Sequence, residues 1–290
     1  MHISWADVQL FLAIAETGSL TAAARRLQVT QPTMSRRLAE LEDSLGEPLF
    51  ERDAAGTSLT SFGERLLVPA RRMAEEAGEV ERVAAGAGNE PRGIVRVSAA
   101  PGVAFDLLAP FAARVRAKLP DVRLEVSSTT AYVDLARREA DLALRFDRPP
   151  QRDLVSLASV THPVRAYATK AYAATLPKQA TLADVDWIAW PPTLAHLPPN
   201  PQLAARIPGF APVFTSNDYL VQLRAAEAGV GAVILDRGHR KRDDSSRLVE
   251  LDIDFGKLAS TSHLVCARSS LTIARVKAVA DLLVAELTER

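Results

Sequence analysis

The sequence predicts a mainly α N-terminal domain that ends in a long helix, followed by a larger α/β region. Three observations lead to this prediction. Two short helices meet at a tight turn within residues 19–45, and a heptad-like apolar pattern covers residues 66–84. After a glycine- and proline-rich break at residues 84–93, short β-rich runs alternate with helical ones. A length of 290 residues leaves room for about two such domains.

The second helix of the N-terminal pair is predicted to begin near Gln31, because Thr30 is a good N-cap and Pro32 falls in the first turn. Apolar side chains then recur at steps of four, three and four, which places them on one buried stripe. The stripe consists of Met34, Leu38, Leu41 and Leu45. Ser35 and Arg36 point away from it, in the two turns with which a recognition helix reaches DNA bases.

The first helix is expected over residues 20–27, with Ser19 as its cap. Its run of alanines at 22–24 permits close helix crossing, while Arg25 and Arg26 are free to meet phosphates. The pair is typical of a helix-turn-helix that enters a DNA groove.

These motifs closely resemble the DNA-binding domain of LysR-type transcriptional regulators. The matching segments are residues 11–27, 30–38, 41–46, 49–52 and 59–63. The resemblance implies a winged helix-turn-helix, with residues 46–60 as a wing along the DNA backbone. The helix pattern and the resemblance together give the candidate DNA contacts, which are Arg25, Arg26, Gln31, Pro32, Thr33, Ser35, Arg36, Arg37 and Arg52. One departure is Ala55, where the family usually has a second basic residue in the wing.

Charge is the hardest test of this prediction. Residues 1–90 contain nine arginines and no lysine against fourteen acidic residues, which leaves a net charge of −5, whereas a nucleic-acid domain is normally basic. Four arginines do fall within the helix-turn-helix, while Glu75, Glu76, Glu79 and Glu81 belong to the later helix. We expect weak, salt-sensitive nonspecific binding and useful affinity only from several DNA-binding domains in one particle.

The later helix carries the pattern by which such domains could be joined. Ser61 and Glu64 have capping-box spacing, and Pro69 is expected to kink the helix or stress its first turns. The seam consists of Leu66, Ala70, Met73, Ala77, Val80 and Ala84, of which the first five are the candidate dimerisation residues. From the pattern alone it packs either on its own domain or on a second copy. The resemblance implies dimerisation, and hence a homodimer or a homotetramer on a pseudo-palindromic promoter site.

The C-terminal half reads as a doubly wound α/β region that can form two small lobes. Strands are expected at residues 94–98, 122–126, 142–146, 164–168, 187–190, 230–235 and 263–267. Helices are expected from the stripe at 104, 108, 111 and 115, over residues 219–228, and from the stripe at 273, 276, 280, 283 and 287.

This half also resembles the effector-binding domain of LysR-type regulators, which is built like a periplasmic binding protein. The matches are residues 94–101, 138–145, 186–190 and 228–235. The expected organisation is a DNA-binding domain (1–60), a linker helix (61–86), a hinge (87–93) and an effector domain (94–290). Lobe I is placed at about 94–160 and 263–290, and lobe II at about 161–262. The basic run at 239–242 is either a solvated loop or a contact with DNA or another subunit.

Ligands in open α/β sheets settle at the carboxyl ends of strands, near helix N-termini. Three segments qualify: residues 100–102, 127–130 and 216–218. The candidate effector contacts are Ala100, Pro101, Ser128, Thr129, Arg145, Trp190 and Asn217. For Ser128, Thr129 and Asn217 an ordinary helix cap is the alternative, and for Trp190 it is a core position. A hydroxyl-rich, mildly basic cleft suits a small carboxylate or polar effector.

Catalysis and cofactors find little support. The five histidines show no metal-ligand spacing with one another or with Cys266, and no nucleophile elbow or phosphate loop appears. We therefore predict no enzyme activity, no metal and no cofactor. The alternative is a cytoplasmic small-molecule binding protein or hydrolase whose N-terminal domain only oligomerises.

The expected location is cytoplasmic. The first residues lack the pattern of a signal peptide, no run of about 18 apolar residues occurs, and a single cysteine fits a reducing compartment. We expect no membrane contact. The resemblance further implies that a ligand closes the two lobes, alters the packing of dimers and so changes DNA bending and the recruitment of RNA polymerase.

Overall fold

The computed structural model describes residues 3–53, 56–84, 90–147, 153–236, 247–255 and 259–289, and the chain divides into two compact units. The N-terminal unit is Met1–Asn89 and the C-terminal unit is Glu90–Arg290. Each has its own hydrophobic core. The hinge predicted at 87–93 lies partly outside the described residues, as do Ala55 and the basic run at 239–242.

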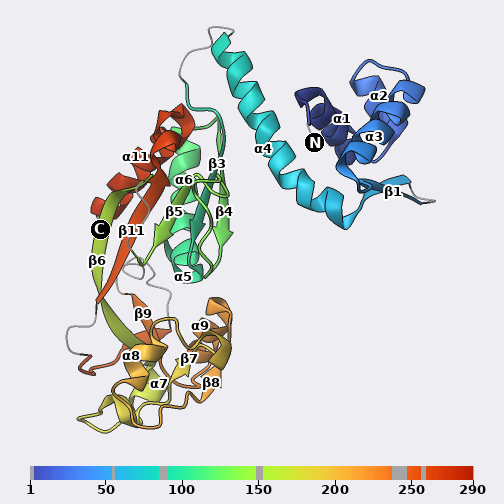
Figure 1. The fold of residues 1–290 in the computed structure, drawn as a ribbon. Coiled ribbons are helices and arrows are strands. Elements are labelled where there is room, and N and C mark those ends of the chain that lie inside the picture. The colour runs from blue at the N-terminus through green and yellow to red at the C-terminus, as the bar shows by residue number, and fades with distance from the viewer. Residues whose placement is uncertain are drawn as a thin grey trace. The chain divides into compact units, whose positions relative to one another are not determined.

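The N-terminal unit is a three-helix core followed by a hairpin and a long helix (Figure 1). Its elements are α1 (Trp5–Thr17), α2 (Leu20–Arg26), α3 (Gln31–Leu45), β1 (Phe50–Asp53), β2 (Gly56–Leu59) and α4 (Ser61–Ala84). Both predicted caps are present: the Ser19 hydroxyl accepts from Ala22 N–H and the Thr30 hydroxyl from Thr33 N–H. The turn between α2 and α3 places Gln28 at φ 56°, in the left-handed region.

The start of α4 corrects one prediction. The helix is capped by Thr60, whose hydroxyl accepts from Gly63 N–H at 3.0 Å and donates to the Pro48 carbonyl at 2.7 Å. Ser61 is therefore the first helical residue and not the cap. Thr60 rather than Ser61 is the cap because its hydroxyl bonds both the helix and the chain that enters the hairpin. The second of these bonds is a tertiary contact, which the spacing of Ser61 and Glu64 does not reveal. Pro69 lies inside α4, which is a single α-helix over its whole length.

The C-terminal unit is built on a seven-stranded mixed sheet with the order β10-β6-β11-β5-β3-β4, in which β9 also pairs with β6; β9 is Val233–Asp236 and β10 is Leu248–Glu250. β3 runs parallel to β4 and β5, whereas β11 runs antiparallel to β5 and β6. The elements of this unit form two parts, which strand β6 joins. The strands of the first part are β3 (Gly93–Ala99), β4 (Val122–Ser128), β5 (Leu142–Arg145), the first half of β6 (Leu154–Thr169) and β11 (Ala259–Ala267).

Helices cover this first part of the sheet. They are α5 (Pro101–Val103), one π-turn η1 (Ala104–Leu108), α6 (Ala109–Lys118), the 3-10 turn η4 (Arg268–Thr272) and α11 (Ala274–Thr288). The predicted stripes are confirmed, since Phe111 and Val115 of α6 and Val276 and Leu283 of α11 are buried in one core.

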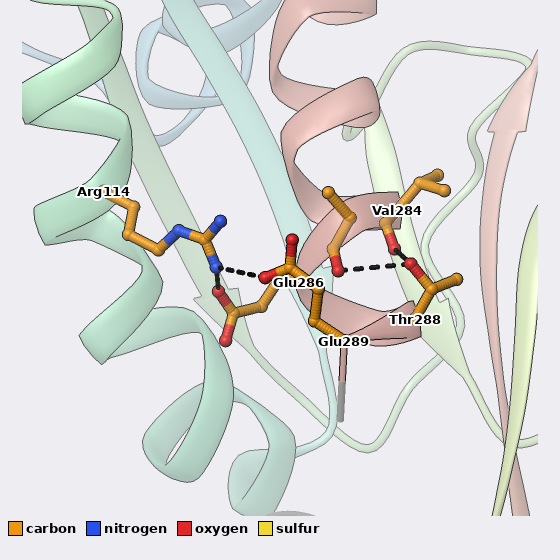
Figure 2. Close-up of polar contacts among 6 residues, drawn as sticks. Arg114, Val284, Glu286, Thr288 and Glu289 are labelled. Carbon is orange, nitrogen blue, oxygen red and sulfur yellow. Dashed lines mark hydrogen bonds and ion pairs between the residues drawn. The ribbon is translucent and has the colours of Figure 1, made fainter.

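Arg114 ties these two helices together (Figure 2). Its guanidinium reaches from α6 to the buried carboxylate of Glu286 on α11, and it lies 3.7 Å from the more exposed Glu289. The Thr288 hydroxyl bonds the Val284 carbonyl in the last turn of α11. The ion pair fixes the outer helices over the sheet that carries the candidate ligand site.

The second part contains shorter elements. They are α7 (Lys170–Ala173), η2 (Leu182–Asp184), β7 (Ile188–Ala189), η3 (Pro192–Leu194), α8 (Asn200–Ala204), β8 (Phe214–Thr215), α9 (Tyr219–Glu227), β9 (Val233–Asp236) and β10 (Leu248–Glu250). Two cores hold them together, one around Trp187 and Phe255 and the other around Ile188 and Leu223.

Long β6 joins the two parts and corrects another prediction. The sequence pattern predicts extended structure only at residues 164–168, but β6 begins at Leu154 and pairs with β11 from Leu154 to Pro163, with a shift in register at Leu157. From Val164 onward it pairs with β9 and β10. The first half escapes prediction because Ser156, Ser159 and Thr161 interrupt the apolar pattern, and its order comes from pairing rather than from burial. The lobe boundary predicted at 160–161 thus falls inside one strand.

Candidate nucleic-acid interface and ligand cavity

Helix α3 presents a polar face over a buried one. Met34, Leu38 and Leu41 lie in the core of the N-terminal unit. Gln31 and Arg36 are exposed in the first two turns, as the apolar stripe predicted. The core therefore fixes the rotation of the helix and leaves its N-terminal outer face free for a partner.

The remaining predicted contacts of α3 differ in exposure. Pro32 is exposed, while Thr33, Ser35 and Arg37 are half-buried. The Arg36 guanidinium lies 3.6 Å from the Glu40 carboxylate, with side-chain exposures of 74% and 67%. An exposed pair of this kind contributes at most about 1 kcal/mol, so it leaves Arg36 free to exchange Glu40 for another acceptor.

The two arginines of α2 differ. Arg25 and Arg26 are both exposed, but Arg26 is ion-paired with Glu16 of α1. Contact between Arg26 and a phosphate therefore requires that this pair give way. β1 and β2 form the expected hairpin, with Arg52 opposite Thr57 in the ladder. The hairpin is fastened to the helices by the Thr57 N–H, which donates to the Gly18 carbonyl.

The seam on α4 divides into two parts. Leu66 packs against the core of its own unit and Ala70 is buried in it. Further along, Met73 is 42% and Val80 is 68% exposed, with half-buried Ala77 between them. The first part fits the intramolecular alternative, and the second part leaves apolar side chains uncovered in the single chain.

In the C-terminal unit the three predicted strand ends converge on one cavity of about 460 Å³, a size suited to a small molecule. It is lined by Pro101, Ala104, Phe105, Ser128, Thr129, Thr130, Asn217, Asp218, Tyr219 and Leu220. Three distant parts of the sequence supply these residues: α5 with the start of η1, the end of β4 with the two residues that follow it, and the start of α9 with the two residues before it. Ala100 lies directly before the cavity and caps α5 without a side-chain bond.

One side of the cavity is held to the other by Tyr219. Its hydroxyl donates to the Asp106 carboxylate at 3.0 Å, and its ring centroid lies 6.5 Å from that of Phe105. A Cβ on Gly102 would come within 3.1 Å of the Tyr219 ring, so glycine permits this close approach. The contact joins α5 and η1 of the first part to α9 of the second.

Three predicted effector residues do not line this cavity: Ala100, which lies directly before it, and two residues that are held elsewhere. The first of these two is Arg145, whose guanidinium donates to the Val133 carbonyl and lies 5.1 Å from the centroid of the Tyr132 ring. Burial lowers the pKa of Arg145, whereas burial and the adjacent Asp147 raise the pKa of Tyr132 to about 12.

The second is Trp190, which is held elsewhere in the second part. Its indole N–H donates to the Pro198 carbonyl, and its backbone exchanges hydrogen bonds with the Asn200 amide. Trp190 is half-buried and belongs to none of the hydrophobic cores of the described residues, so the core position that the sequence gave as its alternative is also wrong.

The predicted effector contacts did not include six residues that line the cavity: Ala104, Phe105, Thr130, Asp218, Tyr219 and Leu220. Phe105 could have been found, because it lies off the apolar stripe of its helix and is 47% exposed. Tyr219 gave no such signal, since its role depends on Gly102, which lies more than a hundred residues earlier.

Other kinds of site find little support in the described residues. They contain no group of three or more histidine, cysteine, aspartate or glutamate residues placed to hold a metal ion. Among the helices of the described residues, none is long and apolar enough to cross a membrane.

Comparisons with known proteins cover both units. The family model "Bacterial regulatory helix-turn-helix protein, lysR family" matches residues 5–64, and "LysR substrate binding domain" matches residues 88–288.

Among curated relatives, the HTH-type transcriptional regulator CrgA of Neisseria meningitidis serogroup C (strain 8013) is 32% identical over 139 residues. That match covers 48% of this chain and 46% of the relative, about half its length. The Mau operon transcriptional activator of Paracoccus denitrificans is 28% identical, covering 81% of this chain and 77% of the relative.

The fold is also that of a solved structure. The structure of CrgA, a LysR-type transcriptional regulator from Neisseria meningitidis, covers 99% of both chains at 26% identity and a TM-score of 0.56. Since one family model matches the helix-turn-helix and the other matches the unit with the cavity, the chain belongs to the LysR family of DNA-binding transcriptional regulators.

Proposed function

We propose that this protein regulates transcription by binding a promoter site through α3 and by sensing a small effector in the cavity between α5, β4 and α9. The observation that carries the first part is the exposed face of α3, where Gln31 and Arg36 stand on a helix fixed by buried Met34 and Leu38. Arginine and glutamine pair with guanine and adenine edges in the major groove. Pro32, Thr33, Ser35 and Arg37 extend this face, and Arg25, Arg26 and Arg52 are assigned to phosphates.

The regulator acts as a homo-oligomer in this proposal. The N-terminal unit is short of positive charge, so a single copy supplies few phosphate contacts. Met73 and Val80 on the far part of α4 are the side chains that a second copy covers, seven residues apart on one face. Two joined copies place two α3 helices on successive turns of a pseudo-palindromic site.

Effector binding is assigned to the cavity because it lies where two parts of the C-terminal unit meet. Hydroxyl and amide groups of Ser128, Thr129 and Asn217 line it. A ligand there contacts both parts, and its differential affinity for the closed arrangement shifts the population of the regulator. The altered packing of subunits then changes DNA bending and the recruitment of RNA polymerase.

A gel-shift assay with DNA from the promoter region of its own gene tests the DNA-binding proposal. Arg36→Ala is expected to weaken the specific shift by about tenfold or more, as for the loss of one bidentate base contact. Arg116→Ala removes another exposed arginine, from the C-terminal unit, and is the matched control. If no site shifts, or if Arg36→Ala binds like wild type, the proposal is wrong.

The oligomer proposal has its own test. Met73→Glu or Val80→Glu is expected to shift the sedimentation coefficient toward that of a single chain, because a charge in a seam between copies is left unpaired. Val68→Glu, an exposed apolar position off the seam, is the control and should sediment like wild type. Unchanged sedimentation of both seam variants contradicts the assignment.

A further inference from the structure

The cavity lacks the charge that a carboxylate effector requires. Among the described residues that line it, Asp218 alone carries a formal charge, and none is lysine, arginine or histidine. The guanidinium of Arg145, which the sequence offered as a cation, is engaged instead with Val133 and the ring of Tyr132. A second carboxylate, that of Asp106, stands directly behind the Tyr219 hydroxyl. The lining therefore favours positive over negative charge.

The N-terminus of α9 does not reverse this preference. Free N–H groups at a helix start ordinarily bind anions. Here one oxygen of Asp218 already accepts from Leu220 N–H at 2.7 Å and from Val221 N–H at 3.1 Å. The first turn is thus occupied by a built-in anion, held in place at the cavity wall. A carboxylate ligand at this position would be repelled by the Asp218 carboxylate, which already occupies the N–H donors of Leu220 and Val221.

Two aromatic rings form the adjoining wall. Phe105 and Tyr219 lie with their centroids 6.5 Å apart and their planes tilted by 53°, and both line the cavity. Rings at such an angle form part of a cage for an ammonium group, because each ring face is electronegative. The Asp106 carboxylate that accepts from the Tyr219 hydroxyl fixes the orientation of that ring. Exposed Leu220 adds an apolar surface next to it.

We propose that the cavity binds a small organic cation, a primary or quaternary amine that carries an apolar or aromatic group. This inference rests on the proposed function and names the ligand class of the same site. Asp218 is the counter-ion, the rings of Phe105 and Tyr219 cover the ammonium and its apolar substituent, and Ser128 and Thr130 accept hydrogen bonds from the amine or from a second polar group. The sequence predicted a small carboxylate or polar effector, and this proposal replaces the carboxylate alternative by a ligand of opposite charge.

Three probes of matched shape test the proposal on the full chain. They are 2-phenylethylamine, 3-phenylpropionate and 2-phenylethanol, whose binding is measured by isothermal titration calorimetry at fixed ionic strength. The amine is expected to bind about tenfold or more tightly than the carboxylate, with the alcohol between them. Asp218→Asn should reduce the affinity for the amine by about tenfold and leave that for the alcohol unchanged.

The asparagine introduced by this variant is also a good helix cap, so the change removes the charge and not the start of α9. Asp252→Asn is the matched control, because Asp252 lines a separate cavity beside β10, and it should leave all three affinities unchanged. Phe105→Leu should weaken the amine more than the alcohol, since leucine fills similar space without a ring face.

Several results overturn the proposal. They are equal or tighter binding of the carboxylate, no binding of the amine, and an amine affinity that Asp218→Asn leaves unaltered. The gel-shift assay distinguishes failure of the cation proposal from failure of the proposed function. An Arg36-dependent shift with no preference for the amine overturns the ligand class alone, whereas amine binding without any DNA shift overturns the regulator and leaves the cation site in place.

Discussion

The two functional surfaces of this chain are specified in different ways. The DNA-facing surface comes from one short stretch, in which the cap at Thr30, the proline at 32 and the buried Met34 all act within a few residues of Arg36. The cavity is assembled from three segments separated by up to about a hundred residues, and its contacts depend on strand pairing and on the approach of Tyr219 to Gly102. The residues of a site within one short stretch can be predicted from the local pattern of the sequence. For a site assembled from distant segments, the sequence indicates some of the residues but not which of them lie in contact.

Met34→Ala gives the largest expected effect and tests whether the two surfaces depend on separate cores. The Met34 side chain is fully buried in the N-terminal unit, so its truncation should cost about 3 kcal/mol of unfolding free energy. We expect DNA binding to be lost although Arg36 is intact. Chemical denaturation followed by circular dichroism measures the change, and Ala39→Ser on the exposed face of α3 is the control. Wild-type stability would contradict the role of the buried stripe.

Arg114→Met makes the matching test in the C-terminal unit. It removes the Arg114 guanidinium that pairs with the buried Glu286 carboxylate. Loss of one partner of a buried pair costs about 3–5 kcal/mol, and we expect on the order of 2 kcal/mol because Arg114 is partly exposed. Arg116→Met on the exposed side of α6 is the control. Urea denaturation should separate the two variants, and equal midpoints would show that the pair in Figure 2 adds nothing.

Gly102→Ala tests the contact across the cavity. The added Cβ would lie 3.1 Å from a carbon of the Tyr219 ring, so we expect about 1.5 kcal/mol of destabilisation through displacement of that ring. Most of this loss should vanish in a Tyr219→Ala background, where the methyl group has nothing to meet. A double-mutant cycle by denaturation measures the coupling. Additive effects would contradict the close approach as its cause.

Several elements could be predicted from the sequence because the information is local. The caps at Ser19 and Thr30, the stripes on α3 and α11, and strands β3 and β5 all occur where the residue pattern predicts them. Each depends on residue spacing that puts apolar groups on one face. The winged hairpin followed from the family resemblance rather than from spacing.

The misses share a physical reason. Thr60 caps α4 because its hydroxyl also bonds Pro48, and the first half of β6 is ordered by pairing with β11. The sequence predicts that Arg145 faces the ligand, but the ring of Tyr132 and the carbonyl of Val133 hold its guanidinium. In each case the deciding partner lies far away in the sequence or in a loop whose path no periodicity predicts.

Cys266 gives the smallest expected effect on stability, and its labelling distinguishes unfolding of the C-terminal unit from unfolding of the N-terminal unit. It is the single cysteine of the chain, and it lies buried in β11 of the C-terminal unit. Burial raises the pKa of its thiol to about 11. The folded state therefore favours the neutral thiol. This contribution to stability is complete below the ordinary thiol pKa, and it declines as the pH rises toward the raised value.

Between pH 8 and pH 10 the wild type should thus lose about 1 kcal/mol more unfolding free energy than Cys266→Ala, which lacks the ionising group. At pH 8 a thiol reagent should label Cys266 only at the rate at which the C-terminal unit opens. Because the N-terminal unit has no cysteine, Met34→Ala should abolish DNA binding without accelerating this labelling, whereas Arg114→Met should accelerate it. Faster labelling in Met34→Ala would mean that the two units do not unfold separately, and the unit with the assembled site would then depend on the unit with the local one.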